Sequence, residues 1–187
     1  MNRIQILCIV GGIGLATFVA GCSKKHDEGS AALGSKTATV AGVQWSVPQR
    51  WGDGGQRPMR VATYAIPASQ GDAEAAECAV SFFGAGQGGP VEMNIDRWVG
   101  QFENPSTPEK ATKEVNGLKV STVKIAGAYL TPGGPMMTSQ GKKENYRLIG
   151  AIVEAPQGMV FFKLTGPSKT VESAAAEFDA MVGSLKK

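Results

Sequence analysis

The sequence predicts an α+β fold: a mainly antiparallel β-sheet flanked by two amphipathic helices. Segments rich in β-branched and aromatic residues outnumber helical ones, and short turns such as Ala41-Gly42 and Asn116-Gly117 join neighbouring segments. Such turns are typical of hairpins, whose strands run antiparallel. Two other segments, 91–102 and 169–185, repeat apolar residues at a helical period. Each of these helices needs an apolar sheet surface to cover, which completes the predicted α+β sandwich.

The expected strands share β-propensity and are bounded by glycine, proline or polar turns. They span residues 37–40, 43–47, 59–67, 77–83, 111–115, 118–129, 146–154 and 159–165.

The two expected helices differ in how they are bounded. The first runs from Val91 to Phe102, after Pro90, which suits a first helical turn. The prolines at 105 and 108 follow its end. The last helix runs from about Lys169 to Leu185, with one apolar face formed by Val171, Ala175, Phe178, Val182 and Leu185.

The N-terminal segment has the layout of a secretory signal. Residues 1–21 contain no acidic residue and one base, Arg3, followed by an apolar run from Ile4 to Ala20. As a membrane span this run is marginal, because about 20 apolar residues are needed and its glycines weaken it. An ordinary signal peptide and a single N-terminal anchor helix are the alternatives to a lipoprotein signal.

The tetrapeptide Val19-Ala20-Gly21-Cys22 resembles the bacterial lipobox. The resemblance implies that the Cys22 sulfur receives a diacylglycerol, that the signal is cut before Cys22, and that the new amine is acylated, for example with palmitate. Acyl chains give stable membrane anchoring, at about 0.8 kcal/mol for each buried methylene. Ser23 follows the cysteine, which by the same resemblance favours the outer membrane on its periplasmic face.

The chain therefore divides into three predicted parts: a signal peptide at 1–21, a flexible tether at 22–36 and a single α+β domain at 37–187. The tether is polar and rich in small residues, and its Lys24, Lys25 and His26 either contact anionic headgroups or are simply solvated. A net charge of +3 is too small to indicate a nucleic-acid partner.

Cysteine and histidine usage argues against catalysis. Of three cysteines, Cys8 leaves with the signal, Cys22 carries lipid and Cys78 lies in an expected strand, where a buried, inert thiol is predicted. The single histidine, His26, lies in the tether, so no Ser/His/Asp or Cys/His set is expected in the domain. We expect no enzyme, no cofactor and no metal site, although Met136 and Met137 form a remote candidate for copper.

Two short motifs resemble the PsbP-like superfamily, which includes DcrB-like bacterial lipoproteins. They are Trp45-Ser46-Val47-Pro48-Gln49-Arg50-Trp51 and the final-helix pattern Phe178-x-x-Met181-x-x-Ser184-Leu185. The order of expected elements over residues 37–187 is also similar. The resemblance implies a fold and no particular activity, because members of the superfamily perform unrelated tasks.

A glycine-rich segment between an expected strand and the first helix is the sharpest motif. Gly84, Gly86 and Gly89 fit G-x-G-x-x-G, and backbone amides of Gly84, Gly86, Gln87, Gly88 and Gly89 are candidates to hold an anion. A dinucleotide site is not expected, because hairpins follow instead of a βαβ unit and no acid ends a strand about 20 residues on. The alternative is a turn that redirects the chain.

The pairs Phe82-Phe83 and Phe161-Phe162 place one ring on each face of the sheet, since strand side chains alternate. Rings on a face without a helix are candidates for a binding surface, unless the loop 131–145 or the first hairpin covers them. The sequence thus predicts a lipid-anchored, non-enzymatic envelope module that binds a protein partner or another envelope component. A domain that binds a small molecule or anion at the glycine-rich turn is the alternative.

Overall fold

The computed structural model describes residues 33–131 and 141–187, within one compact unit from Ala31 to Lys187. The predicted signal peptide, Cys22 and the Met136-Met137 pair lie outside these ranges.

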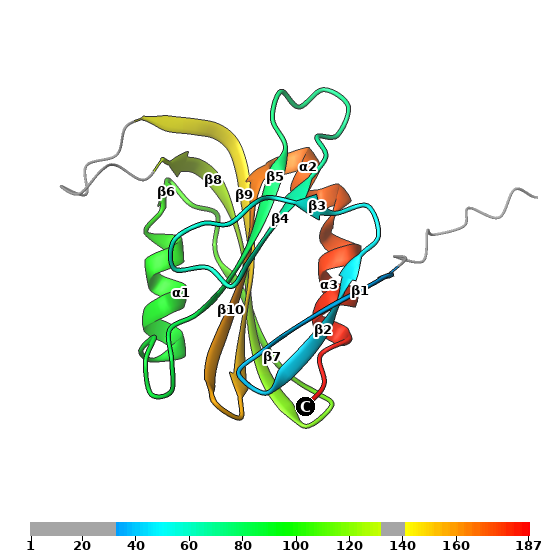
Figure 1. Cartoon of the computed structure of the whole chain (residues 1–187). Helices are drawn as coiled ribbons and strands as arrows, with labels where there is room; N and C mark the ends of the chain where they lie inside the picture. Colours follow the sequence, from blue (N-terminus) through cyan, green and yellow to red (C-terminus); the bar gives the residue numbers. More distant parts are fainter. Residues whose placement is uncertain (1–32, 132–140) are drawn as a thin grey trace, which may run out of the picture. The chain divides into compact units, whose positions relative to one another are not determined.

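The first two strands form a hairpin of their own. Strand β1 (Leu33–Val40) pairs antiparallel with β2 (Val43–Pro48) in a separate two-stranded sheet (Figure 1). Ala41 and Gly42 between them have φ angles of 53° and 77°. Positive φ at both positions is the type I′ turn that matches the twist of a hairpin. The hairpin prediction is confirmed, but β1 begins at Leu33, so the strand includes residues assigned to the tether.

The main sheet has eight strands in the order β3-β4-β5-β10-β9-β8-β6, with β7 also paired to β8. All its described pairings are antiparallel, which confirms the predicted fold class. The strands are β3 (Gly52–Asp53), β4 (Ala62–Ile66), β5 (Ala76–Phe82), β6 (Phe102–Glu103), β7 (Glu109–Val115), β8 (Leu118–Leu130), β9 (Lys142–Ala155) and β10 (Gly158–Pro167).

Helix α1 (Val91–Val99) is shorter than predicted. The chain leaves the helix at Gly100, and Phe102 pairs with Tyr129 as the first residue of β6. Phe102 is buried, so its apolar character reflects packing against the sheet and not a further helical turn. Helical periodicity cannot distinguish these two uses of one apolar side chain.

The predicted C-terminal helix is divided into α2 (Ser168–Ser173) and α3 (Ala175–Gly183). The break falls at Ala174. Its backbone N–H donates hydrogen bonds to both the Thr170 and Val171 carbonyls, at 3.1 and 3.2 Å. The start of α2 is held from outside the helix, because Asp72 Oδ2 accepts hydrogen bonds from the Thr170 amide and hydroxyl at 2.8 and 2.6 Å. Such a carboxylate satisfies the free amides of a helix start.

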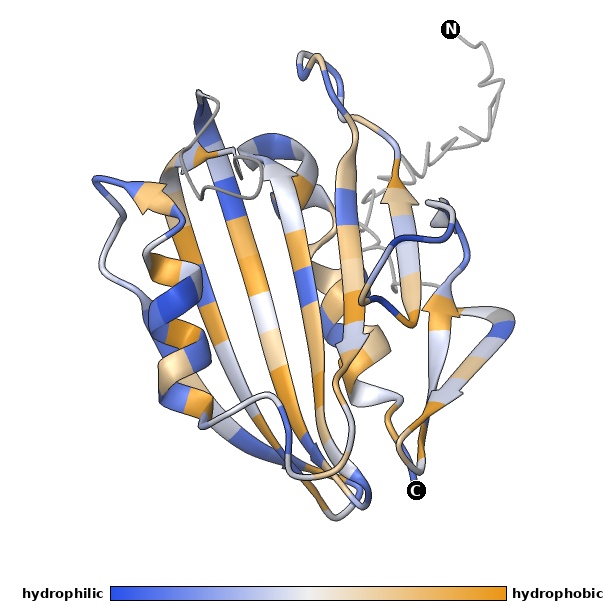
Figure 2. Ribbon diagram, turned by 60° about the vertical axis from the view of Figure 1, so that its left-hand side comes forward, coloured by the Kyte–Doolittle hydropathy of each residue, from blue (hydrophilic) through white to orange (hydrophobic). Residues whose placement is uncertain are grey.

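The molecule has helices on both faces of the sheet. Helix α1 covers one face, and α2, α3 and the β1–β2 hairpin cover the other (Figure 1). The alternating orange and pale or blue segments along the central strands reflect side chains that point to opposite faces (Figure 2). Phe162 is fully buried on the hairpin side, whereas Phe161 is buried on the α1 side. Neither ring of this pair is left on an open surface.

Candidate functional site

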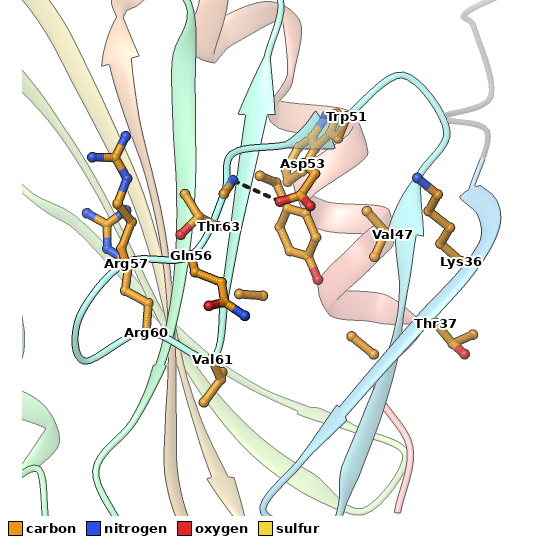
Figure 3. Close-up of a pocket in the computed structure, with 15 residues that line it drawn as sticks. Lys36, Thr37, Val47, Trp51, Asp53, Gln56, Arg57, Arg60, Val61 and Thr63 are labelled. Carbon is orange, nitrogen blue, oxygen red and sulfur yellow. Dashed lines mark hydrogen bonds between the residues drawn. The ribbon is translucent and has the colours of Figure 1, made fainter.

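A cleft of about 560 Å³ lies between β1 of the hairpin and the β3–β4 edge of the main sheet (Figure 3). Its apolar lining includes Val47, Trp51 and Tyr64, and its margin carries charged and polar side chains.

The aromatic part of the cleft is fixed by hydrogen bonds to α3 and within the wall formed by β4. Trp51 Nε1 donates to Glu177 Oε2 of α3 at 2.8 Å, and Arg50 Nε donates to the same carboxylate at 2.7 Å. Trp45 Nε1 donates to the Tyr64 hydroxyl at 3.1 Å. Burial raises the pKa of Tyr64, so this phenol stays neutral at physiological pH. The Trp45–Trp51 motif thus joins the hairpin to both α3 and β4.

The margin of the cleft is mainly cationic. Lys36 lies on one side, with Arg57 and Arg60 on the other (Figure 3). Arg60 Nη1 binds Glu77 Oε1 at 2.6 Å, and the Asp53 carboxylate accepts a hydrogen bond from the Gly55 amide at 2.8 Å. Lys36 and Arg57 have no ion pair among the described residues. Asp53 also lines the cleft and has no ion pair among the described residues, so three cations and one carboxylate line it and the net charge presented to an occupant is positive.

The β1 strand borders the cleft with an unpaired backbone edge. Gln44 of β2 exchanges two hydrogen bonds with Lys186, at 2.8 and 3.0 Å, so its backbone polar groups point away from β1. Thr39 stands directly opposite Gln44 and is therefore in a non-hydrogen-bonded pair, with its own N–H and C=O directed away from β2. Thr37 occupies the next equivalent position, opposite Ser46. Within the described ranges, no strand pairs with this outer edge.

One buried polar atom in the cleft lining also has no partner. Thr63 is 4% exposed, and its Oγ1 makes no hydrogen bond within the described part of the chain. The Thr63 side chain does not face the hairpin, because Thr63 stands opposite Ala79 of β5 and the next residue, Tyr64, bonds Trp45 on the hairpin side.

The glycine-rich turn at 84–89 is built differently from an anion site. Gly84, Gly86, Gly88 and Gly89 all have positive φ, which suits glycine, and the segment redirects the chain from β5 into α1. Asn94 Nδ2 donates to the carbonyls of Gly88 and Pro90 at 2.7 and 2.9 Å. These carbonyls converge on a buried amide of the protein itself.

The hollow beside this turn has the wrong charge for an anion. Gln87 lines it together with Gly86 and Gly89, and its only charged lining residue is Glu154. The geometry therefore supports the turn interpretation, and anion binding at Gly84–Gly89 stays a prediction without structural support.

Cys78 has the environment that the sequence predicts. It is fully buried in β5, and burial raises the pKa of its thiol far above the ordinary range. In the described residues no three potential ligands among His, Cys, Asp and Glu cluster as a metal site would require. Nor does any helix in these ranges have the length and apolar character to cross a bilayer.

Sequence reasoning missed Lys36, Arg57 and Thr63 as cleft residues. Lys36 was assigned to the tether, and Arg57 falls in the irregular segment before β4, which begins at Ala62 and not at Met59. Only the meeting of the hairpin with the β4 edge brings them together. The proline at 48 and the glycines at 52, 54 and 55 were the available signals that the chain turns here.

Comparison with known proteins supports the fold. No family model and no curated protein matches the chain. The solution structure of cyanobacterial PsbP (CyanoP) from Synechocystis sp. PCC 6803 is similar with a TM-score of 0.50 and 13% identity, over 96% of this chain and 98% of that one. A crystal structure of PA94, a protein of unknown function from Pseudomonas aeruginosa, gives a TM-score of 0.48 and 12% identity, over 81% and 96%. The likeness to CyanoP shows that the chain has a PsbP-like α+β fold.

Proposed function

We propose that the protein is a lipid-anchored, non-enzymatic module of the bacterial envelope that binds an extended, acidic segment of a partner protein in the β1–β4 cleft. The unpaired outer edge of β1 is the observation that carries this proposal. A strand edge with free N–H and C=O groups is a template for another strand, and peptide recognition by strand addition uses it.

The chemistry of the cleft favours an acidic segment. A peptide on β1 would align its backbone with Thr37 and Thr39 while its side chains alternate between the apolar lining and the margin. Lys36 and Arg57 lack carboxylate partners in the described ranges, and acidic side chains would supply them.

The anchor would keep this cleft close to a membrane. If Cys22 is acylated, only residues 23–32 separate the lipid from the start of β1 at Leu33. The partner would then be a protein of the same envelope compartment, and the lipobox resemblance with Ser23 favours the periplasmic face of the outer membrane. The absence of histidine after His26 and the buried thiol of Cys78 fit a binding role better than a catalytic one.

Site-specific crosslinking tests the partner site. A photoreactive benzoylphenylalanine at Thr37 in the full-length, membrane-bound protein should crosslink to one envelope protein, and at the exposed Lys113 of β7 it should not. High salt should weaken the Thr37 crosslink, because the cleft attracts the segment by charge.

Proline in the open edge then separates strand addition from other contacts. Thr39→Pro removes an outward N–H without breaking a β1–β2 bond, whereas Thr39→Ala keeps that N–H. We expect Thr39→Pro to abolish the crosslink and Thr39→Ala to keep it. An equal crosslink in both variants would exclude pairing on β1.

The anchor is tested separately with the two N-terminal cysteines. Cys22→Ala should lose labelling by radioactive palmitate and leave the carbonate-washed membrane fraction. Cys8→Ala is the matched control, since Cys8 lies within the signal and its loss should change neither result. Retention of Cys22→Ala in washed membranes would show that lipid on Cys22 is not the anchor.

A further inference from the structure

A second, smaller cavity lies on the other face of the sheet, between α1 and the segment before β4. Its volume is about 180 Å³. The floor is formed by β5 and β10 through Ala79, Ser81 and Lys163, and α1 provides Arg97 and Trp98. The small side chains at Ala79 and Ser81 leave the space that larger residues would fill.

Three cations and one carboxylate surround this cavity. Arg60, Arg97 and Lys163 line it, and Glu77 binds Arg60 at 2.6 Å. Arg97 Nη1 donates to Asn94 Oδ1 at 3.2 Å, and Lys163 Nζ donates to Gln101 Oε1 at 2.5 Å, so both have neutral hydrogen-bond partners. No described carboxylate forms an ion pair with either side chain. The cavity therefore holds an excess of positive charge.

Lys163 is the most unusual of these groups. A half-buried ammonium normally gains a carboxylate, because removal from water disfavours its charge. Here burial lowers the pKa of Lys163 to about 8, and nearby Arg60 adds to the effect while Glu77 opposes it. A bound anion would provide the missing compensation.

Aromatic rings form the rest of the wall. The Phe161 ring centroid lies 5.6 Å from that of Phe83 and 6.5 Å from that of Trp98. Phe83 is 40% exposed, so apolar surface at the opening remains available. The glycine-rich turn contributes here indirectly: a Cβ at Gly88 would lie 2.8 Å from Phe161 Cζ, so glycine allows this ring its position.

We propose that this cavity binds a small organic anion, with a carboxylate facing Lys163 and Arg97 and a flat apolar body against Phe83, Trp98 and Phe161. The volume is below the range of about 300–1,000 Å³ found for drug-sized ligands, which favours a monocyclic or branched carboxylate. The aromatic wall distinguishes this ligand from a free inorganic anion, which would leave the rings without a contact.

Benzoate is the probe that tests the site in the full-length protein, with benzyl alcohol as its neutral analogue and inorganic phosphate as its non-aromatic one. Titration followed by the Trp98 indole resonance should give saturable shifts with benzoate and none with the other two. Lys163→Met and Arg97→Gln should each raise the benzoate Kd at least fivefold. Lys113→Met, at an exposed position on β7, should leave the Kd unchanged.

The variants keep the test interpretable. Lys163→Met retains the apolar stem and removes the charge, so we expect a folded domain with an unchanged amide spectrum outside the cavity. Lys163 and Arg97 line this cavity and not the β1–β4 cleft. A negative result for benzoate is therefore distinguishable from a failure of the partner proposal. An unchanged Kd in Lys163→Met, equal binding of benzyl alcohol, or equal binding of phosphate would overturn the proposal.

Discussion

Glu177 shows how a single side chain organises the region around the cleft. Its carboxylate is the common acceptor for Arg50 and Trp51, which lie in the segment between β2 and β3. The Glu177 side chain is 15% exposed, so this charge-assisted pair is more protected from solvent than a surface salt bridge. The Val-Pro-x-x-Trp pattern is thus an anchoring point: the proline ends β2 and the tryptophan attaches the chain to α3.

Lys163 gives a prediction about pH and stability. Burial lowers its pKa to about 8 in the folded domain, against an ordinary value of 10.5 in an unfolded chain. Between these values the unfolded Lys163 binds more protons than the folded one, so this side chain makes the free energy of unfolding rise with pH. From pH 7.5 to 9.5 we expect its contribution to increase by about 1 kcal/mol, allowing for partial exposure of the side chain. The buried Cys78 thiol acts in the opposite direction, because burial raises its pKa and only the unfolded chain loses that proton in this range.

Urea denaturation of the wild-type protein and of Lys163→Met at several pH values isolates this contribution. The variant keeps Cys78 and lacks the titrating ammonium, so from pH 7.5 to 9.5 the difference in the free energy of unfolding should change by about 1 kcal/mol in favour of the wild type. The series ends at pH 9.5 because burial raises the pKa values of Tyr64 and Tyr129, whose ionisation would lower stability above pH 10. A difference between the two proteins that stays constant with pH would contradict the assignment to Lys163.

At the scale of elements, hairpin turns were easier to predict than the ends of helices. Asn116 and Gly117, with φ of 49° and 76°, form the same type of turn as Ala41-Gly42, and sequence alone located both. The end of α1 and the break at Ala174 were missed, because Phe102 and Ala175 fit a helical period wherever the helix stops. Helix α1 ends where it does because Phe102 pairs with β8, and no local residue in the sequence signals that pairing.

The contact between α1 and the sheet depends on one glycine. A Cβ at Gly150 of β9 would lie 2.3 Å from Trp98 Cζ3, which places the indole almost directly on the backbone. Gly150→Ala should therefore displace α1 and destabilise the domain by about 1–3 kcal/mol. Thermal or urea denaturation measures the loss.

Gly183 provides the matched substitution. It lies at the end of α3, and nothing is found within 4 Å of its ideal Cβ position. Gly183→Ala should be neutral or stabilise the domain by up to about 1 kcal/mol, through helix propensity alone. Equal effects of the two substitutions would contradict a specific contact between Trp98 and Gly150.

At the scale of the molecule, the class of fold followed from hairpin turns, but the arrangement of layers did not. Alternation showed that Phe161 and Phe162 point to opposite faces, without showing that α1 covers one face and α2, α3 and the hairpin the other. Both candidate cavities arise from this arrangement. Their residues come from segments far apart in the sequence, so no local motif such as Gly84–Gly89 could reveal them.

The two apolar layers share one sheet, and we expect them to unfold together. Trp98 lies in the α1 layer, whereas Trp45 and Trp51 lie in the other, and these are the three tryptophans of the chain. A Trp98→Phe variant therefore reports on the hairpin side, and a Trp45→Phe, Trp51→Phe variant reports on the α1 side. Within each variant, the fluorescence midpoint in urea should coincide with that of far-UV circular dichroism.

A truncation of the shared core sharpens this test. Phe162 is fully buried against Trp45, with ring centroids 5.1 Å apart, and Phe162→Ala should cost about 3–5 kcal/mol. Because Phe162 lies on central strand β10, the loss should shift the Trp98 signal as much as the Trp45 and Trp51 signal. A Trp98 midpoint that stays in place while the other moves would mean that the α1 layer, with its cationic cavity, is a separate cooperative unit.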